Sequence, residues 1–128
     1  MLPGRGGTLL AVDDEPILLR LMEDYLTRLG YVVEACSNAQ EALRRFRQQP
    51  SGYALVVTDM CLPDMAGEEM LAELVRLNPQ VRILACSGYL PDLDLLPEAR
   101  GRLRFLQKPF APEMLSSAVA ELLSEPEA

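Results

Sequence analysis

The sequence predicts an α/β fold in which one parallel sheet carries helices on both faces. Five short apolar runs, several of them rich in β-branched residues, predict strands at residues 8–12, 31–36, 54–58, 81–86 and 103–107. Segments with apolar side chains at helical spacing lie between most of these runs, and Pro, Gly or Asn marks several junctions. Because parallel strands need crossover connections, this alternation indicates right-handed strand–helix–strand units in a single sheet.

The first unit pairs the strand at residues 8–12 with a helix over residues 16–29. Pro16 suits the first turn of a helix, and Gly30 suits the position after its end. The apolar side chains between them recur at helical spacing and predict an amphipathic helix: Ile17, Leu18, Leu21, Met22, Tyr25, Leu26 and Leu29.

The second and third units follow the same pattern. After the strand at 31–36, Ser37 and Asn38 are candidate N-caps of a helix that extends to about Gln48. We expect this helix to bury Ala42, Leu43 and Phe46. The helix after Gly67 should end at Asn78-Pro79, and its predicted buried residues are Met70, Leu71, Leu74 and Val75.

The fourth unit departs from the pattern. A helix is expected between Gly88 and Arg102, but Pro97 in a helix interior would cost about 3 kcal/mol. This helix should therefore be short, kinked or split, and we expect residues 89–102 to be mobile. The last helix should begin at Pro112 and end before Pro126, with a buried face of Met114, Leu115, Ala118, Val119, Leu122 and Leu123.

Length and composition limit the possible functions. The 128 residues suffice for one domain, which we place at residues 8–124, between a flexible leader at 1–7 and a tail at 125–128. A net charge of −7 argues against direct binding of nucleic acid. Without a signal peptide or an apolar run of membrane-spanning length, the sequence predicts a cytoplasmic protein that does not insert into a membrane.

Cysteine and histidine content excludes several kinds of site. The three cysteines form no Cys-x-x-Cys pair, and Cys36 and Cys86 lie in predicted strands as small buried side chains. The chain contains no histidine, so a Ser-His-Asp triad, a His-containing metal site and an internal phosphohistidine are all excluded.

Polar side chains stand at the ends of four predicted strands. Asp13 and Asp14 follow the first strand, and Asp59 follows the third. Ser87 and Lys108 follow the fourth and fifth. If the strands are parallel, these ends lie on one edge of the sheet, where open α/β sheets bind ligands. Three carboxylates so close together need a cation, and hard oxygen ligands suit Mg²⁺.

In this order and spacing, the sequence resembles the receiver domain of two-component response regulators over about residues 8–123. The resemblance is carried by Asp13-Asp14, by Asp59 with Pro63 and Gly67 behind it, by Ser87-Gly88 and by Lys108-Pro109-Phe110. It implies a flavodoxin-like (βα)5 three-layer sandwich with the strand order 2-1-3-4-5.

The resemblance also implies roles for individual residues. Asp59 would be the phosphoacceptor, and Mg²⁺ would be bound directly by Asp14, Asp59 and the main-chain carbonyl of Cys61, and through water by Asp13. Lys108, aimed by a cis Lys-Pro bond, would neutralise phosphoryl charge.

Three further positions would modulate the site. The Ser87 hydroxyl would bond the phosphoryl group and act with Phe105 as a switch, although Phe105 lacks the hydroxyl of a tyrosine and also fits a plain core role. Cys61 and Tyr89 would tune the access of water to the phosphoryl group.

The implied function is phosphoacceptance in a phosphorelay. A histidine kinase or a phosphotransfer protein carrying phosphohistidine would donate the phosphoryl group, and a downstream protein or an effector domain would contact the surface formed by residues 89–123. A dimer on phosphorylation is also compatible with the resemblance. The domain would not be an enzyme, beyond assisting its own phosphorylation and dephosphorylation.

Two other functions fit the predicted fold less well. A Mg²⁺-dependent aspartyl phosphatase needs a second acid two residues after its nucleophile, where this chain has Cys61. A flavodoxin-like flavin module needs a hydroxyl- and glycine-rich phosphate loop after the first strand. Here Asp13, Asp14 and Glu15 occupy that position and would repel phosphate.

Overall fold

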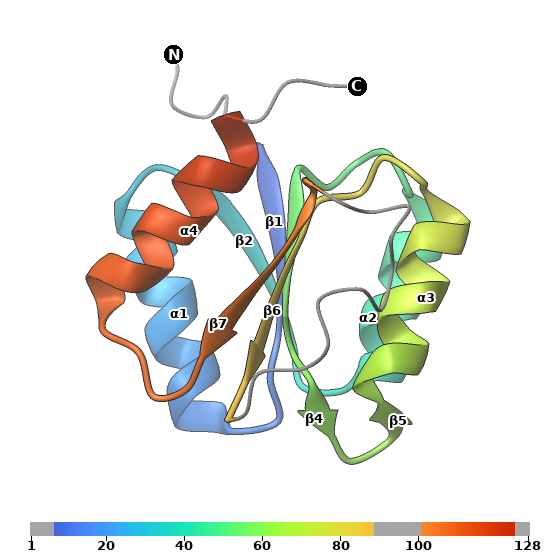
Figure 1. Cartoon of the computed structure of the whole chain (residues 1–128), viewed down its shortest axis with the longest axis horizontal. Coiled ribbons are helices and arrows are strands. Elements are labelled where there is room, and N and C mark those ends of the chain that lie inside the picture. The colour runs from blue at the N-terminus through green and yellow to red at the C-terminus, as the bar shows by residue number, and fades with distance from the viewer. Residues whose placement is uncertain (1–6, 89–100, 125–128) are drawn as a thin grey trace.

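The computed structural model describes residues 7–88 and 101–124, which form seven strands and four helices (Figure 1). The strands are β1 (Thr8–Val12), β2 (Val32–Cys36), β3 (Leu55–Asp59), β4 (Cys61–Leu62), β5 (Met65–Ala66), β6 (Ile83–Ser87) and β7 (Leu103–Gln107). The helices are α1 (Pro16–Arg28), α2 (Ala39–Gln48), α3 (Gly67–Leu77) and α4 (Pro112–Ser124). The predicted fourth helix and Tyr89 lie outside the described residues.

Five strands form one parallel sheet in the order β2-β1-β3-β6-β7. Without the short strands β4 and β5, this order is the predicted 2-1-3-4-5. Helices α1 and α4 lie on one face of the sheet, and α2 and α3 lie on the other (Figure 1). The three-layer flavodoxin-like architecture is therefore confirmed.

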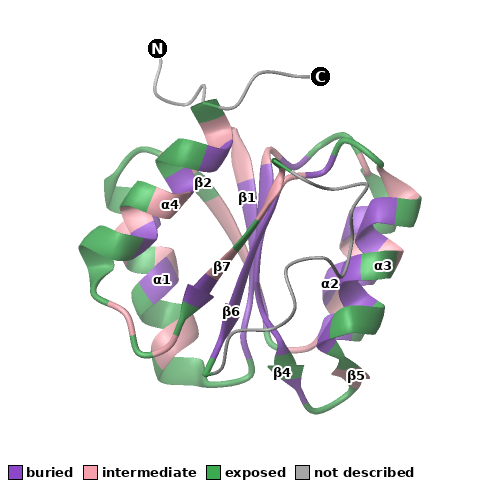
Figure 2. Ribbon diagram, viewed as in Figure 1, coloured by how far each residue is buried: buried purple, intermediate pink, exposed green. Residues whose placement is uncertain are grey.

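Each face of the sheet has its own hydrophobic core. Because side chains alternate along a strand, Leu9 packs on the side of α1 and α4, while Leu10 packs on the side of α2 and α3. Strands β3 and β6 are buried along their whole length, and β2 and β7 at the edges are more exposed (Figure 2). A core on both faces explains why the central strands are continuous apolar runs.

The amphipathic patterns correctly predicted the buried faces of α2 and α3. For α1 and α4, the predicted apolar faces are wider than the faces that are buried in the structure. Within α1 only Met22 and Leu26 are buried, and Ile17 and Leu21 are 77% and 59% exposed. Met114 in α4 is also exposed, at 49%. The apolar stripe on α1 is wider than the strip of helix that contacts the sheet, so its margins face outward.

Strands β4 and β5 form a two-stranded antiparallel hairpin directly after Asp59, which the sequence did not predict. Two-residue strands are too short to produce a periodic pattern. The hairpin is closed at its base by Gly67, where an added Cβ would lie 2.5 Å from the carbonyl oxygen of Met60. Gly67 is thus needed for this close approach of two backbone segments.

None of the helices in the described ranges is long and apolar enough to cross a membrane.

Candidate functional site

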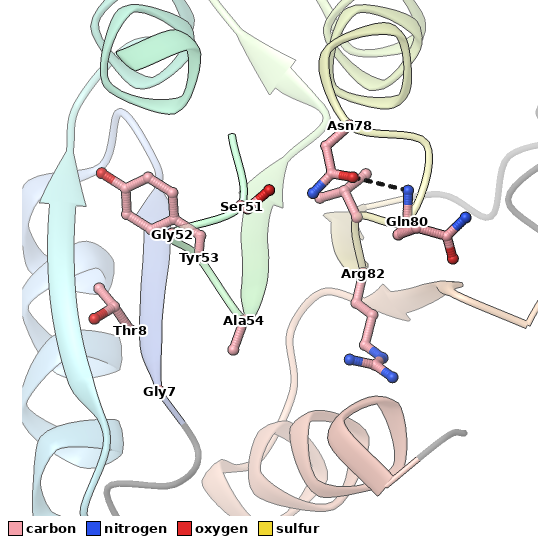
Figure 3. A pocket seen from close by; sticks show the side chains of 10 residues that line it. Gly7, Thr8, Ser51, Gly52, Tyr53, Ala54, Asn78, Gln80 and Arg82 are labelled. Carbon is pink, nitrogen blue, oxygen red and sulfur yellow. Dashed lines mark hydrogen bonds between the residues drawn. The ribbon is translucent and has the colours of Figure 1, made fainter. Parts of the chain in front are cut away.

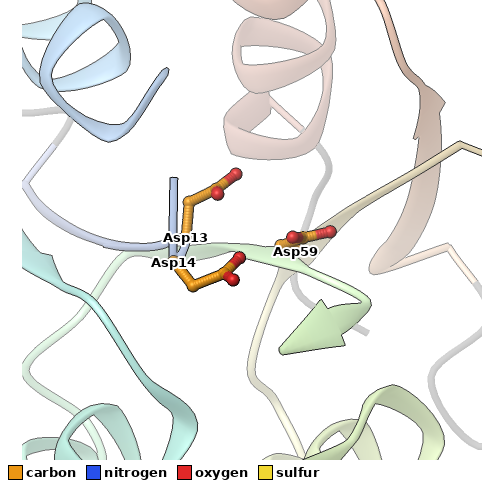
Figure 4. A group of neighbouring side chains, drawn as sticks. All are labelled: Asp13, Asp14 and Asp59. Atoms are coloured by element: carbon orange, nitrogen blue, oxygen red, sulfur yellow. The ribbon is translucent and has the colours of Figure 1, made fainter. Parts of the chain in front are cut away.

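Three carboxylates meet at the carboxyl edge of the sheet. Asp13 and Asp14 follow β1, and Asp59 is the last residue of the adjacent parallel strand β3, so the two strand ends lie side by side. One carboxylate oxygen from each of the three residues lies within 4.8 Å of the others (Figure 4). Asp13 and Asp59 are 1% and 6% exposed, whereas Asp14 faces solvent.

Within the described part of the chain, Lys108 provides the positive charge that contacts this cluster. Its ammonium nitrogen Nζ lies 3.1 Å from Oδ2 of Asp13, 3.4 Å from Oδ2 of Asp59 and 3.8 Å from Oε1 of Glu15. The backbone N–H of Lys108 donates to the carbonyl of Ser87 at 2.7 Å, which holds the chain after β7 against the end of β6. The Lys108–Pro109 peptide bond is cis, as the resemblance implies.

The electrostatics of the cluster favour a bound cation. Burial raises the pKa of Asp13, and the Asp59 charge adds to this effect, while the Glu15 N–H and Lys108 lower the pKa without cancelling the rise. Partial burial lowers the pKa of Lys108, but its hydrogen bond to Asp13 and the charges of Asp13 and Asp59 outweigh that effect and raise it. Of the three clustered aspartates, Asp13 and Asp59 thus share one ammonium.

The Asp59 side chain is oriented by the loop that follows it. Its Oδ1 accepts a hydrogen bond from the backbone N–H of Cys61 at 3.2 Å, and its Oδ2 faces Lys108. The next residue, Met60, donates its N–H to the carbonyl of Cys86 at 2.8 Å, which keeps this turn on β6. Clustered carboxylate oxygens with one solvent-facing member are the donor set that Mg²⁺ prefers, so these residues fit the metal.

Comparison with known proteins decides the family. Residues 9–120 match the response regulator receiver domain family. The chain belongs to this family. Receiver domains are the phosphoacceptors of two-component signalling, they bind Mg²⁺ at an acidic pocket, and they interact with histidine kinases or phosphotransfer proteins and with effector domains. The phosphatase and flavin-module alternatives are therefore not favoured.

Individual relatives agree with this membership. The two-component response regulator ARR11 of Arabidopsis thaliana is 41% identical over 84 residues, which are 65% of this chain and 16% of that protein. Sensor kinase CckA of Brucella abortus is 32% identical over 120 residues, which are 92% of this chain and 13% of that protein. The receiver domain thus spans a small part of the length of these two relatives.

A solved structure shows the same fold. The response regulator protein TrrA of Thermotoga maritima, in complex with Mg²⁺-BeF, superposes with a TM-score of 0.78 at 27% identity. The superposition covers 91% of this chain and 98% of TrrA.

The structure places the other predicted site residues of the receiver domain as follows. Ser87 ends β6 and is buried, and Cys61 is exposed in β4. Phe105 lies in β7 opposite Ala85, half-buried against the core on the α2 and α3 side. The switch roles of Ser87 and Phe105 and the access role of Cys61 stay predictions, and Tyr89 lies outside the described residues.

Two acids near the site were not predicted to act there. Glu15 contacts Lys108, as given above, from the residue before α1. Asp64, between β4 and β5, accepts hydrogen bonds from the backbone N–H groups of Ala39 and Gln40 at the start of α2. These partners are 25 and 24 residues away in the chain, so no local pattern could have indicated the contact.

The opposite, amino edge of the sheet carries a polar hollow of 490 Å³ (Figure 3). Its lining includes Thr8 and Ala54, beside the starts of β1 and β3, and polar side chains of Asn78, Gln80 and Arg82. Its lining includes none of the three clustered aspartates. Since Thr8 and Asp13 flank β1 at opposite ends, this hollow is separate from the acidic site.

Proposed function

We propose that Asp59 is the phosphoacceptor of this receiver domain and receives its phosphoryl group from a phosphohistidine. The observation that carries this proposal is the position of the Asp59 carboxylate at the end of a central strand. There it is oriented by the N–H of Cys61, faces Lys108 at 3.4 Å and lies beside Asp13 and Asp14. Asp13 is less exposed than Asp59 and has the shorter contact with Lys108, so its carboxylate is less accessible to an incoming phosphoryl group.

The chemistry is transfer of a phosphoryl group from nitrogen to oxygen. A carboxylate oxygen of Asp59 forms the new O–P bond of an acyl phosphate as the N–P bond of the phosphohistidine breaks. Such transfers depend mainly on positioning and charge neutralisation. Lys108 supplies one positive charge, and Mg²⁺ bound by Asp13, Asp14, Asp59 and the Cys61 carbonyl would supply the rest. The Ser87 hydroxyl is the proposed donor to the phosphoryl group after transfer.

The proposed partners follow from this chemistry. The domain turns over no separate substrate, so we propose that it is not an enzyme beyond assisting its own phosphorylation and dephosphorylation. The donor is a histidine kinase or a phosphotransfer protein, and we place the reaction in the cytoplasm. A downstream protein or effector domain would contact the surface of residues 89–123, with or without dimerisation. The net charge of −7 argues against direct contact with nucleic acid.

The proposal is tested by incubating the protein with acetyl phosphate and Mg²⁺ and measuring its intact mass. The wild type should gain one phosphoryl group, and Asp59→Asn should gain none. Asp24→Asn, which removes the same charge from an exposed position on α1, is the matched control and should react like the wild type. Phosphorylation of Asp59→Asn at the wild-type level and stability would refute the assignment.

A further inference from the structure

The Asp64 side chain attaches the hairpin that follows Asp59 to helix α2. Oδ1 of Asp64 accepts the N–H of Ala39 at 3.0 Å, and Oδ2 accepts the N–H of Gln40 at 2.9 Å. Slight burial raises the pKa of Asp64, but the backbone hydrogen bonds outweigh that effect and lower it overall. The carboxylate is therefore charged at neutral pH and engages the positive end of α2 with both oxygens.

The start of α2 is capped by two different segments of the chain. The first N–H groups of a helix have no partners within the helix. Asn38, the residue before α2, accepts the N–H of Glu41 at 2.8 Å, which is an ordinary local cap. Asp64 accepts the two preceding N–H groups from outside the helix, so its bonds join two elements, whereas the bond of Asn38 stays within one.

The other end of the hairpin is part of the phosphoacceptor site. Cys61 in β4 pairs with Ala66 in β5, and the N–H of Cys61 bonds to Asp59. A two-stranded hairpin with strands of two residues is not stable by itself. Its position therefore depends on its attachments, which include the packing of Gly67 against Met60 at the base, the burial of Leu62 in the core and the Asp64 bonds at the tip.

We propose that Asp64 is a positioning residue for the phosphoacceptor site, because its bonds to α2 hold the hairpin that presents the Cys61 backbone to Asp59. The N–H of Cys61 orients the Asp59 carboxylate, and the carbonyl of Cys61, in the next peptide group, is the proposed main-chain ligand of Mg²⁺. The second half of this inference rests on the proposed function. Loss of Asp64 should therefore reduce the affinity for Mg²⁺, although Asp64 itself is not one of the clustered carboxylates.

The test compares Asp64→Ala with two matched controls. Asn38→Ala removes a cap from the same helix end without touching the hairpin, and Glu68→Ala removes an exposed negative charge from the first turn of α3. Affinity for Mg²⁺ alone is measured by calorimetry at 0.15 M ionic strength or above, where long-range charge effects are screened. Asp64→Ala should weaken binding by roughly tenfold, as for residues that orient metal ligands, and both controls should stay within about twofold of the wild type.

A second readout needs no metal. Amide hydrogen exchange at Cys61 should become faster in Asp64→Ala and remain unchanged in Asn38→Ala, even if both variants lose similar stability. Asp64→Asn, which keeps one acceptor oxygen, should give intermediate values and replaces Asp64→Ala if that variant does not fold.

The two proposals fail in different ways. If wild-type protein binds Mg²⁺ but Asp64→Ala matches Asn38→Ala in both readouts, Asp64 is only a helix cap and the inference is overturned. If wild-type protein neither binds Mg²⁺ nor accepts phosphate, the proposed function falls. The exchange rate at Cys61 then still decides whether Asp64 holds the hairpin.

Discussion

Polar side chains at the two edges of the central sheet differ in the partners that surround them. At the amino edge, the Asn78 side chain donates to the carbonyl of Pro50 at 2.8 Å and accepts the N–H of Gln80 at 3.0 Å. Arg102 donates to the carbonyl of Pro79 at 3.0 Å. At the carboxyl edge, the described structure places Asp13 and Asp59 against the ammonium of Lys108, with Asp14 beside these two carboxylates.

This difference distinguishes polar groups that stabilise the fold from polar groups that are proposed to serve function. Hydrogen bonds at the amino edge close the connections between strands and helices and serve stability. Under the proposed function, excess negative charge at the carboxyl edge opposes stability without a metal, and a bound cation and a phosphoryl group make use of it. Substitutions at the two edges should therefore change the free energy of unfolding in opposite directions, and they should differ in their effect on phosphorylation.

The largest effect is expected from Lys108→Met. Removing a charge positioned for a transferring phosphoryl group typically costs a hundredfold or more in rate, so phosphorylation by acetyl phosphate should slow by roughly a hundredfold. Arg82→Met at the amino edge is the control, and its folded protein should react at close to the wild-type rate. Equal phosphorylation rates for Lys108→Met and Arg82→Met would contradict the view that the carboxyl edge, and not the amino edge, is the functional one. Rates are measured by intact mass over time.

The second contrast concerns stability without metal. Asn78→Ala should lower the free energy of unfolding by about 1–3 kcal/mol, because it removes two hydrogen bonds. Asp13→Asn should raise it by on the order of 1 kcal/mol, because it removes one of three crowded charges, and Asp59→Asn should do the same. Urea denaturation in EDTA gives both values. A loss of stability in both aspartate variants would contradict the view that this edge is strained by charge.

The pH dependence sharpens this second test. The raised pKa of Asp13 means that the folded protein takes up this proton at a higher pH than the unfolded chain. Wild-type stability should therefore gain from this group as pH falls from 7 toward the ordinary aspartate value of 3.8. The gain in free energy of unfolding of Asp13→Asn over wild type in EDTA should therefore shrink over the same interval. A gain that stays constant with pH would show that the Asp13 charge does not cause it.

A third, similar-sized effect is stabilisation by Mg²⁺. At a free concentration of ten times Kd, a ligand that binds only the folded state adds about 1.4 kcal/mol. Wild-type protein and Asn78→Ala should gain this increment equally in thermal melts, since Asn78 lies at the amino edge and the clustered aspartates lie at the other. Asp14→Asn should gain clearly less at the same Mg²⁺ concentration. An increment that falls in Asn78→Ala as much as in Asp14→Asn would show that the edges are coupled.

The smallest effect concerns Asp64, an acid near the carboxyl edge whose hydrogen bonds are satisfied. Its lowered pKa means that its contribution to stability is present above the ordinary value of 3.8 and is lost as pH falls below it. For an exposed charge at a helix N-terminus this contribution is about 0.3–1 kcal/mol. The difference in melting temperature between wild type and Asp64→Ala should thus narrow as pH falls below 3.8. At Asp13, by contrast, a fall in pH toward 3.8 increases the contribution to stability.

Much of the fold was predictable because local patterns and global topology agree. Five apolar runs gave the five strands of the main sheet to within two residues at each end, and Pro16, Gly67 and Pro112 do begin helices. The strand order came from family resemblance, since periodicity carries no information on which strands pair. The exposure of Ile17 and Leu21 was not predicted, because spacing shows that a helix has an apolar side but not how much of it the sheet covers.

The sequence predicted which residues cluster at the site, but it did not predict the contacts between them. Parallel strands bring their carboxyl ends together, so clustering of Asp13, Asp59 and Lys108 follows from topology. Which oxygen faces which nitrogen depends on the loop after each strand, and loops of two or three residues leave no periodic signal. For that reason the hairpin after Asp59 and the bond from Asp64 to α2 became visible only in the structure.

The three thiols of the chain differ in reactivity in a way that offers an experimental handle. Burial raises the pKa of Cys36 to about 11 and that of Cys86 to about 12, so neither is a thiolate at neutral pH. Cys61 is exposed and stands two residues after Asp59. A maleimide dye or nitroxide spin label should therefore attach to the unmodified chain at Cys61 alone. The natural sequence thus carries a single-site attachment point for a spectroscopic probe beside the acceptor carboxylate.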